Sequence, residues 1–206
     1  MTESDKPPHT EPTKPTVYSG EDRKEVLYKS INNSSDPHIR RYATYFLGQL
    51  KGGREIGCLT ALLRDPDKGV RKQAAIALAS SGQEGFAVLS GLIDDPDWKV
   101  RYRVCEALGL MANRDALPLL AAALDDEKDH VRYMAAKSLG MLGEKDAERS
   151  LIPRLNDENV FVRKIVSVSL GKLGGKESAV ALRKRLDTEQ SEDVKNVILE
   201  SIALIG

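Results

Sequence analysis

The sequence predicts an all-α protein, an α-solenoid of about six two-helix repeats. An aliphatic residue followed by a basic one recurs at Ile39-Arg40, Val70-Arg71, Val100-Arg101, Val131-Arg132, Val162-Arg163 and Val194-Lys195. The successive spacings are 31, 30, 31, 31 and 32 residues, and a fixed period of this length is typical of stacked helical repeats. An acidic or polar turn precedes every one of these anchors, and small residues follow them. The 206-residue chain is therefore expected to form one elongated domain built layer on layer.

The turns mark where the second helix of each repeat begins. They are Ser35–Pro37, Asp65–Asp67, Asp95–Asp97, Asp126–Asp129, Asp157–Asn159 and Glu189–Asp193. Aspartate caps the free N–H groups of a helix start, and proline is tolerated in the first turn. Twelve positions after their anchors stand Gly82, Gly143, Gly174 and Gly206, which predicts left-handed caps where the second helices end.

Two segments depart from the repeat. Residues 1–20 contain four prolines and almost no apolar side chains, which predicts a disordered N-terminal tail before a solenoid over residues 21–206. Pro153 falls within the first helix of the fifth repeat. It predicts a kink or a late helix start there.

Helical periodicity assigns a buried face to the second helices. Counting the anchor as zero, positions 0, 4, 7 and 8 share one side, which in the third repeat carries Val100, Val104, Ala107 and Leu108. Position 9 is always small, and its occupants are Gly48, Ala79, Gly109, Gly140, Gly171 and Ala203. Neighbouring second helices are therefore expected to stack closely.

A turn acid and an anchor base keep a spacing of six residues through several repeats. The pairs are Asp65/Arg71, Asp95/Arg101, Asp126/Arg132 and Asp157/Arg163, with Glu189/Lys195 as a terminal copy. Such a series predicts a structural ladder of charge-assisted hydrogen bonds that links each turn to its own or the next second helix. The alternative is a row of ligand-binding arginines.

Positions 2, 3 and 6 of the second helices point away from the core and form the candidate partner-binding face. Its members are Arg41, Tyr42, Tyr45, Lys72, Tyr102, Arg103, Tyr133, Met134, Lys137 and Lys164. Tyrosine, arginine and methionine are enriched in binding interfaces, and the basic members favour a partner protein with an acidic surface. A nucleic acid stacked on the tyrosines is the alternative, although Lys+Arg and Asp+Glu both total 31. A further alternative is that some of these side chains bind no partner and only fill gaps between adjacent second helices.

The repeat Asp95-Pro-Asp-Trp-Lys-Val-Arg-Tyr-Arg-Val-Cys-Glu-Ala-Leu-Gly109 resembles the short HEAT-like repeats of the phycobilisome-lyase type, and the resemblance extends over residues 21–206. It implies a right-handed superhelix with the second helices on the concave side. It also implies an alternative function, that of a tetrapyrrole-handling or bilin lyase-like accessory protein, with Tyr45, Tyr102, Arg103 and Tyr133 as contacts.

No catalytic or metal-binding pattern is found, so we expect neither an enzyme nor a cofactor. The di-iron hydroxylase of the same superfamily is expected to carry His-Glu pairs that this sequence lacks, and His38 and His130 lie three repeats apart. Cys58 and Cys105 form no metal or redox motif and predict free buried thiols. Without a membrane segment or secretory signal we expect a cytoplasmic protein. The apolar last helix, with Leu199 and Leu204, predicts an end covered by a partner, the tail or a second protomer.

Overall fold

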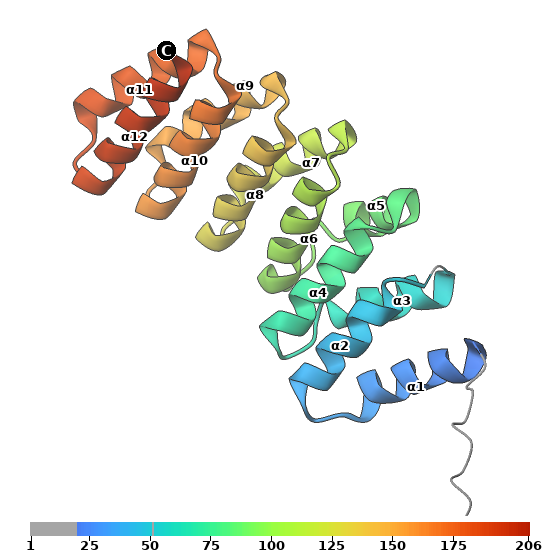
Figure 1. Cartoon of the computed structure of the whole chain (residues 1–206). Coiled ribbons are helices and arrows are strands. Elements are labelled where there is room, and N and C mark those ends of the chain that lie inside the picture. Colours follow the sequence, from blue (N-terminus) through green and yellow to red (C-terminus); the bar gives the residue numbers. More distant parts are fainter. Residues whose placement is uncertain (1–19, 51) are drawn as a thin grey trace, which may run out of the picture.

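The computed structural model describes residues 20–50 and 52–206 (Figure 1). These residues contain no strand. Their α-helices are α1 Gly20–Asn33, α2 Pro37–Leu47, α3 Gly53–Leu62, α4 Lys68–Ala79, α5 Gly82–Gly91, α6 Trp98–Leu110, α7 Leu117–Ala122, α8 Asp129–Leu142, α9 Glu148–Leu151, α10 Val160–Leu173, α11 Lys176–Thr188 and α12 Glu192–Ile205. The expected tail lies almost wholly outside the described residues, and Gly20 already belongs to α1.

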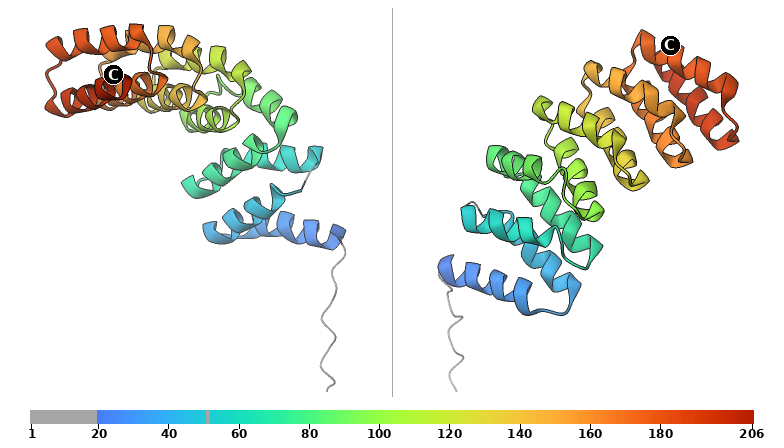
Figure 2. Two further views of the ribbon diagram at one scale, coloured as in Figure 1. Left: turned by 45° about the horizontal axis from the view of Figure 1, so that its top comes forward. Right: turned by 180° about the vertical axis from the view of Figure 1, so that it is seen from behind.

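Consecutive helices pair into six antiparallel units, which confirms the predicted α-solenoid. The second helices, α2, α4, α6, α8, α10 and α12, pack side by side in chain order. Figure 2 shows that they line the inner side of an arc, while the first helices of the units lie on its outer side. A continuous surface built from six second helices is therefore the concave face of the molecule.

Turn side chains start several of the second helices, as the sequence predicts. The Asp36 carboxylate accepts a hydrogen bond from the His38 backbone N–H at 2.8 Å. Asp67 accepts from the backbone of Gly69 at 2.8 Å and of Val70 at 3.0 Å. Each such cap satisfies N–H groups that have no partner inside the helix. The caps thus fix the register in which the anchor residues enter the core.

The predicted left-handed caps form at two of the internal positions. Gly143 (φ 74°) and Gly174 (φ 70°) directly follow α8 and α10 in this conformation. Gly82 (φ 62°) is also left-handed, but α4 already ends at Ala79, so this glycine begins α5 instead. The matching place in the third unit is taken by Ala112, which adopts φ 50° without being glycine. A side chain in this region carries a steric cost.

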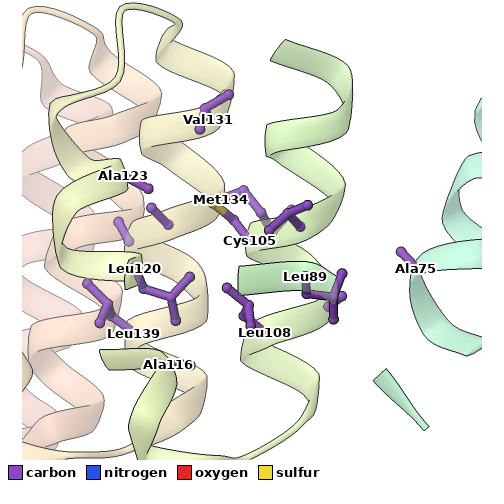
Figure 3. Close-up of a cluster of buried hydrophobic side chains, with 14 of the residues drawn as sticks. Ala75, Leu89, Cys105, Leu108, Ala116, Leu120, Ala123, Val131, Met134 and Leu139 are labelled. Carbon is purple, nitrogen blue, oxygen red and sulfur yellow. The ribbon is translucent and has the colours of Figure 1, made fainter. Parts of the chain in front are cut away.

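The core runs the length of the solenoid between its two helix layers. Positions 0, 4, 7 and 8 are buried in the second and third units, as the helical periodicity predicts. Figure 3 shows part of this core, where Leu89, Leu108, Leu120 and Leu139 from four consecutive helices come together. In the first unit the same face is partly open, because no earlier unit among the described residues packs on it.

The first helices of the fourth and fifth units are broken. In the fifth unit α9 ends at Leu151, and a 3-10 helix over Ile152–Asn156 begins with Pro153 in its first turn. Proline cannot donate the next α-helical hydrogen bond, so the departure predicted at this residue is confirmed. In the fourth unit a 3-10 helix over Ala123–Asp125 likewise follows the short α7, a break that the sequence does not predict.

Candidate partner-binding face

Arginines of the ladder bind two turns at once. Nε and Nη2 of Arg101 donate to the two carboxylate oxygens of Asp126 at 2.6 and 2.9 Å, while Nη1 donates to the carbonyl oxygen of Asp95 at 2.8 Å. Arg132 holds Asp157 in the same way at 2.8 and 3.0 Å. The spacing of six seen in the sequence therefore reflects the carbonyl contact, and the carboxylate contact goes to the following unit.

The ladder differs from the predicted one at both ends. Its first rung joins Arg40 to Asp65 at 2.8 and 2.9 Å, a pair that the spacing of six does not contain. Its last rung joins Arg163 to Glu189 at 2.8 and 2.9 Å. The predicted terminal pair Glu189/Lys195 does not form, because Lys195 Nζ donates to Glu192 at 2.7 Å and Glu189 is held by Arg163 and Arg185.

One rung is missing in the middle, between the second and third units. Arg71 donates to the carbonyl oxygens of its own turn at 2.7 and 2.8 Å, but its Nε is buried without a hydrogen-bond partner. The acceptor expected for it, Asp95, is bound by Arg64 at the end of the first helix. The predicted pair Asp65/Arg71 therefore forms through the Asp65 carbonyl oxygen and links the turn to its own second helix, but Arg71 makes no bond to the next unit. Asp95 enters the ladder only through its carbonyl oxygen.

Small residues set the distance between second helices. A Cβ atom at Gly140 would lie 2.4 Å from Oγ of Ser169, which is closer than two unbonded atoms can approach. The close packing lets the Ser169 hydroxyl donate to the Ala136 carbonyl oxygen of α8 at 2.9 Å. Gly109 and Ser138 repeat the arrangement between α6 and α8, with Ser138 donating to Cys105 at 2.8 Å. These contacts confirm the predicted tight stacking.

The N-terminal half of the concave face is basic. Within residues 20–50 and 52–206, Lys68, Lys72 and Lys99 form no ion pair. The Arg41 guanidinium lies 3.5 Å from the His38 ring and interacts with the Asp67 carboxylate through its charge. Tyr42 beside them is 63% exposed. Tyr45 is also exposed and lies edge-on to Phe46, with ring centroids 5.2 Å apart. Unpaired cations and open aromatic rings thus occur together on α2, α4 and the start of α6.

A pocket of about 390 Å³ occupies the C-terminal half. It is lined by Tyr102, Asp129, His130, Tyr133, Asn159 and Phe161. Three consecutive second helices, α6, α8 and α10, each supply an aromatic ring. The pocket therefore exists only because the units stack.

Asp129 is the single carboxylate in the lining of that pocket. Its Oδ1 accepts from the backbone N–H of His130 and lies against the ring Nδ1 of the same residue, both at 2.7 Å, and its Oδ2 accepts from the Asn159 amide. The hydrogen bond from the His130 ring lowers the pKa of Asp129. The carboxylate is consequently ionised at neutral pH.

Not every residue predicted for the face is exposed on it. Met134 is only 3% exposed and packs beside Cys105 between α6 and α8 (Figure 3), so this prediction is wrong. Arg103 is half-buried, pairs with Glu106 and donates to the Lys68 carbonyl oxygen at 3.3 Å. Lys164 pairs with Asp193 at 2.7 Å. The contacts of Arg103 with Lys68 and of Lys164 with Asp193 join neighbouring units, and a single helical wheel does not contain them.

The residues that precede the anchors also belong to the face, although the sequence pattern does not predict them there. Asp129, His130, Asn159 and Phe161 lie one to three positions before an anchor and were not assigned to the face. The available signal was an aromatic ring directly before the anchor in the fourth and fifth units, His130 and Phe161. Tyr102, Tyr133 and Lys137 were placed correctly on the second helices and remain at least partly exposed.

Other sequence expectations concern chemistry and the last unit. Cys58 and Cys105 are both free, the first half-buried and the second buried. Within the described residues, no three His, Cys, Asp or Glu side chains converge as metal ligands.

None of the described helices has the length and apolar character that crossing a bilayer requires. Leu199 and Leu204 of α12 are exposed.

Comparisons with known proteins agree on the fold. The family model described as HEAT repeats matches residues 24–87, 87–160 and 140–203. A chain in the structure of the CpcE–CpcF complex of phycocyanin lyase from Nostoc sp. PCC7120 is 24% identical, with a TM-score of 0.67 over 73% of this chain and 99% of that chain. A designed armadillo repeat protein in complex with the peptide (KR)4 is 20% identical, with a TM-score of 0.55 over 89% and 99%. Comparison with curated proteins gives no match.

Proposed function

The chain belongs to the HEAT-repeat family, and from this premise we propose that it is a non-catalytic scaffold that holds a partner protein on its concave face. The observation that carries the proposal is the gathering of open aromatic rings and unpaired cations on α2 and α4. Core packing does not require a 63% exposed Tyr42, and solubility does not require tyrosines on the inner side of an arc. Rings and cations of this kind are enriched where proteins bind one another.

Solenoids of this shape suit such a role. Stacked repeats offer one long surface to which each unit contributes a few side chains. The designed armadillo repeat protein similar to this chain is in complex with a peptide, and the phycocyanin lyase chain with a second protein. For the present chain we propose an extended segment of a partner protein as the occupant of the arc.

The charge of the N-terminal half determines which part of a partner fits there. Lys68, Lys72 and Lys99 form no ion pair among the described residues, so an acidic segment would gain charge-assisted hydrogen bonds there without breaking existing ones. A nucleic-acid backbone is less suited to the whole face, because Asp129 and the exposed turn carboxylates of the C-terminal half would repel phosphates.

Capture of partners from native lysate tests the proposal. A groove variant, Tyr42→Ala with Lys68→Glu and Lys72→Glu, should lose a protein that the wild type retains. The control changes α11 on the outer side, with Val180→Ala and Lys184→Glu, and should retain that protein. A photo-cross-linking amino acid at position 42 should become joined to it. Equal recovery by wild type and groove variant would refute the concave face as the binding site.

A second candidate function is that of a bilin lyase-like accessory protein. The aromatic pocket of Tyr102, Tyr133 and Phe161 favours it, because conjugated ring systems stack on aromatic side chains. Absorbance provides the test: addition of the protein to a free bilin should shift and sharpen the visible band, and Phe161→Ala should reduce the shift. An unchanged spectrum would exclude this function.

A further inference from the structure

We infer that the pocket of Tyr102, Tyr133, Phe161, Asp129, His130 and Asn159 binds an arginine side chain of the partner protein. This inference rests on the proposed function and names the chemistry of one contact within it. The C-terminal half of the concave face would then prefer a basic side chain of the partner, whereas the basic N-terminal half prefers an acidic segment.

The walls of the pocket suit a flat cation. Tyr102, Tyr133 and Phe161 come from three successive helices, and the Phe161 ring is 63% exposed. A guanidinium group is attracted to the negative face of an aromatic ring and can lie flat against it. Nearby cations already behave in this way, since Arg103 lies 5.1 Å from the Tyr102 ring centroid and Lys164 lies 6.0 Å from that of Phe161.

Those two native cations do not neutralise the pocket. Arg103 is paired with Glu106, and Lys164 with Asp193. Asp129, in contrast, is hydrogen-bonded to His130 and Asn159 and has no arginine or lysine partner. Arg132 acts on Asp129 only through space, so the carboxylate in the lining has no arginine or lysine in direct contact among the described residues.

The hydrogen bonds to Asp129 leave space for one more donor. A carboxylate offers about four acceptor positions, two on each oxygen. Oδ1 is in contact with two nitrogens of His130, whereas Oδ2 accepts only from Asn159. One position on Oδ2 is open, and a guanidinium that stacks on a ring can direct one of its N–H groups there.

The depression beside the pocket adds negative charge. It is lined by Glu127, Lys128, Asp129, Glu158 and Asn159. In the ion pairs that surround it, the cations are Arg101, Arg132 and Lys128, and the carboxylates are Asp126, Glu127, Asp157 and Glu158. With Asp129 the carboxylates outnumber the cations by two. An arginine entering the pocket would therefore meet an attractive field rather than a neutral one.

The molecule contains its own reporter for this site. Trp98 is the only tryptophan of the chain, and its ring lies 5.2 Å from the ring of His130, which lines the pocket. Binding in the pocket should change the environment of that indole. Tryptophan fluorescence therefore follows occupancy without a label.

The test uses the whole chain and three short probes, acetyl-Gly-Arg-Gly-amide, its citrulline analogue and its glutamate analogue. Citrulline keeps the shape of arginine but carries no charge. The arginine probe should change Trp98 fluorescence in a saturable manner. At equal concentration, the bound amount of the citrulline or the glutamate probe should be at least fivefold lower than that of the arginine probe. Equal binding of the citrulline or glutamate probe, or no saturable change with the arginine probe, would overturn the inference.

Variants locate the binding. Phe161→Ala removes an exposed ring and should leave the fold intact while weakening arginine binding about fivefold; Asp129→Asn should weaken it at least as much. Asp94→Asn removes an exposed turn carboxylate outside the pocket and should stay within twofold of wild type. Unchanged binding by Phe161→Ala would overturn the inference. If the arginine probe does not bind while the groove variant still loses its partner protein, the proposed scaffold function is retained and only the arginine pocket is refuted.

Discussion

The last rung of the ladder should make the solenoid sensitive to acid. Glu189 is only 2% exposed and accepts hydrogen bonds from Arg163 at 2.8 and 2.9 Å and from Arg185 at 2.7 and 3.0 Å. Burial alone would raise its pKa, but the bonds from Arg163, the Ser191 backbone and Arg185 outweigh burial and hold the pKa at about 2 instead of 4.5. The folded state therefore strongly favours the ionised carboxylate.

The size of the effect follows from that shift in pKa. One pKa unit corresponds to about 1.4 kcal/mol, so a shift from 4.5 to about 2 corresponds to about 3 kcal/mol of folding free energy. Because the pKa is lower in the folded state, this contribution is complete above about pH 4.5 and is lost as the pH falls towards 2. Glu189→Gln should lower the free energy of unfolding by about 3 kcal/mol at pH 7 and by much less near pH 2.

Urea unfolding followed by circular dichroism measures the difference at pH 7, 4 and 2.5, and hydrogen exchange of α11 and α12 shows where the loss occurs. Glu158→Gln is the matched control, because the side chain of Glu158 is 86% exposed and lies 3.3 Å from Arg132. An exposed pair contributes about 0.5 kcal/mol or less. A loss for Glu189→Gln below about 1 kcal/mol, or a loss independent of pH, would refute the reasoning.

Four further predictions concern stability, thiol reactivity and assembly. Ala112→Gly should raise the free energy of unfolding by about 0.5–1 kcal/mol because it relieves a left-handed alanine, whereas Gly143→Ala, which meets no neighbour within 4 Å, should lower it by a similar amount; urea unfolding compares the two. Gly140→Ala should cost about 1–3 kcal/mol because its Cβ would clash with Ser169, while Gly91→Ala, with no atom within 4 Å, should cost nothing. Burial raises the pKa of the Cys105 thiol to about 12, so Ellman's reagent should modify Cys58 in the native protein and Cys105 only in urea; rapid native modification of both would contradict this. If a second protomer covers α12, light scattering should give a dimer mass that Leu204→Glu halves, and a single-chain mass at every concentration would rule that assembly out.

Periodicity alone was sufficient to predict the units, the two helices in each and the buried face of the second helix. Val100, Val104, Ala107 and Leu108 are buried because positions on one side of a helix are fixed by 100° steps. The break at Pro153 was equally predictable, since a missing N–H acts within its own turn.

The contacts that depend on neighbouring units could not be read from one repeat. Whether Arg71 or Arg64 reaches Asp95 depends on how the second and third units pack together, and no residue spacing encodes that packing. Met134 is buried because α6 packs over it, although its helical position equals that of the partly exposed Arg103. Phe161 belongs to the candidate site because α6, α8 and α10 share a pocket, which depends on how the units stack.

The missing rung makes the interface between the second and third units, here called the seam, different from the other interfaces. Where the other interfaces have an arginine clamped to the next turn, Arg71 leaves Nε unpaired, and the exposed Arg64 side chain holds Asp95 instead. Ala79 occupies the position at which Gly109 and Gly140 allow the next second helix to approach most closely. The arc also bends between α4 and α6 (Figure 2). We therefore expect the first two units to swing as one body against the last four. Arg41, Lys68 and Lys72 lie on one side of this seam and the whole aromatic pocket on the other, so a partner that engages both would set the angle between them and hold the arc at a single curvature.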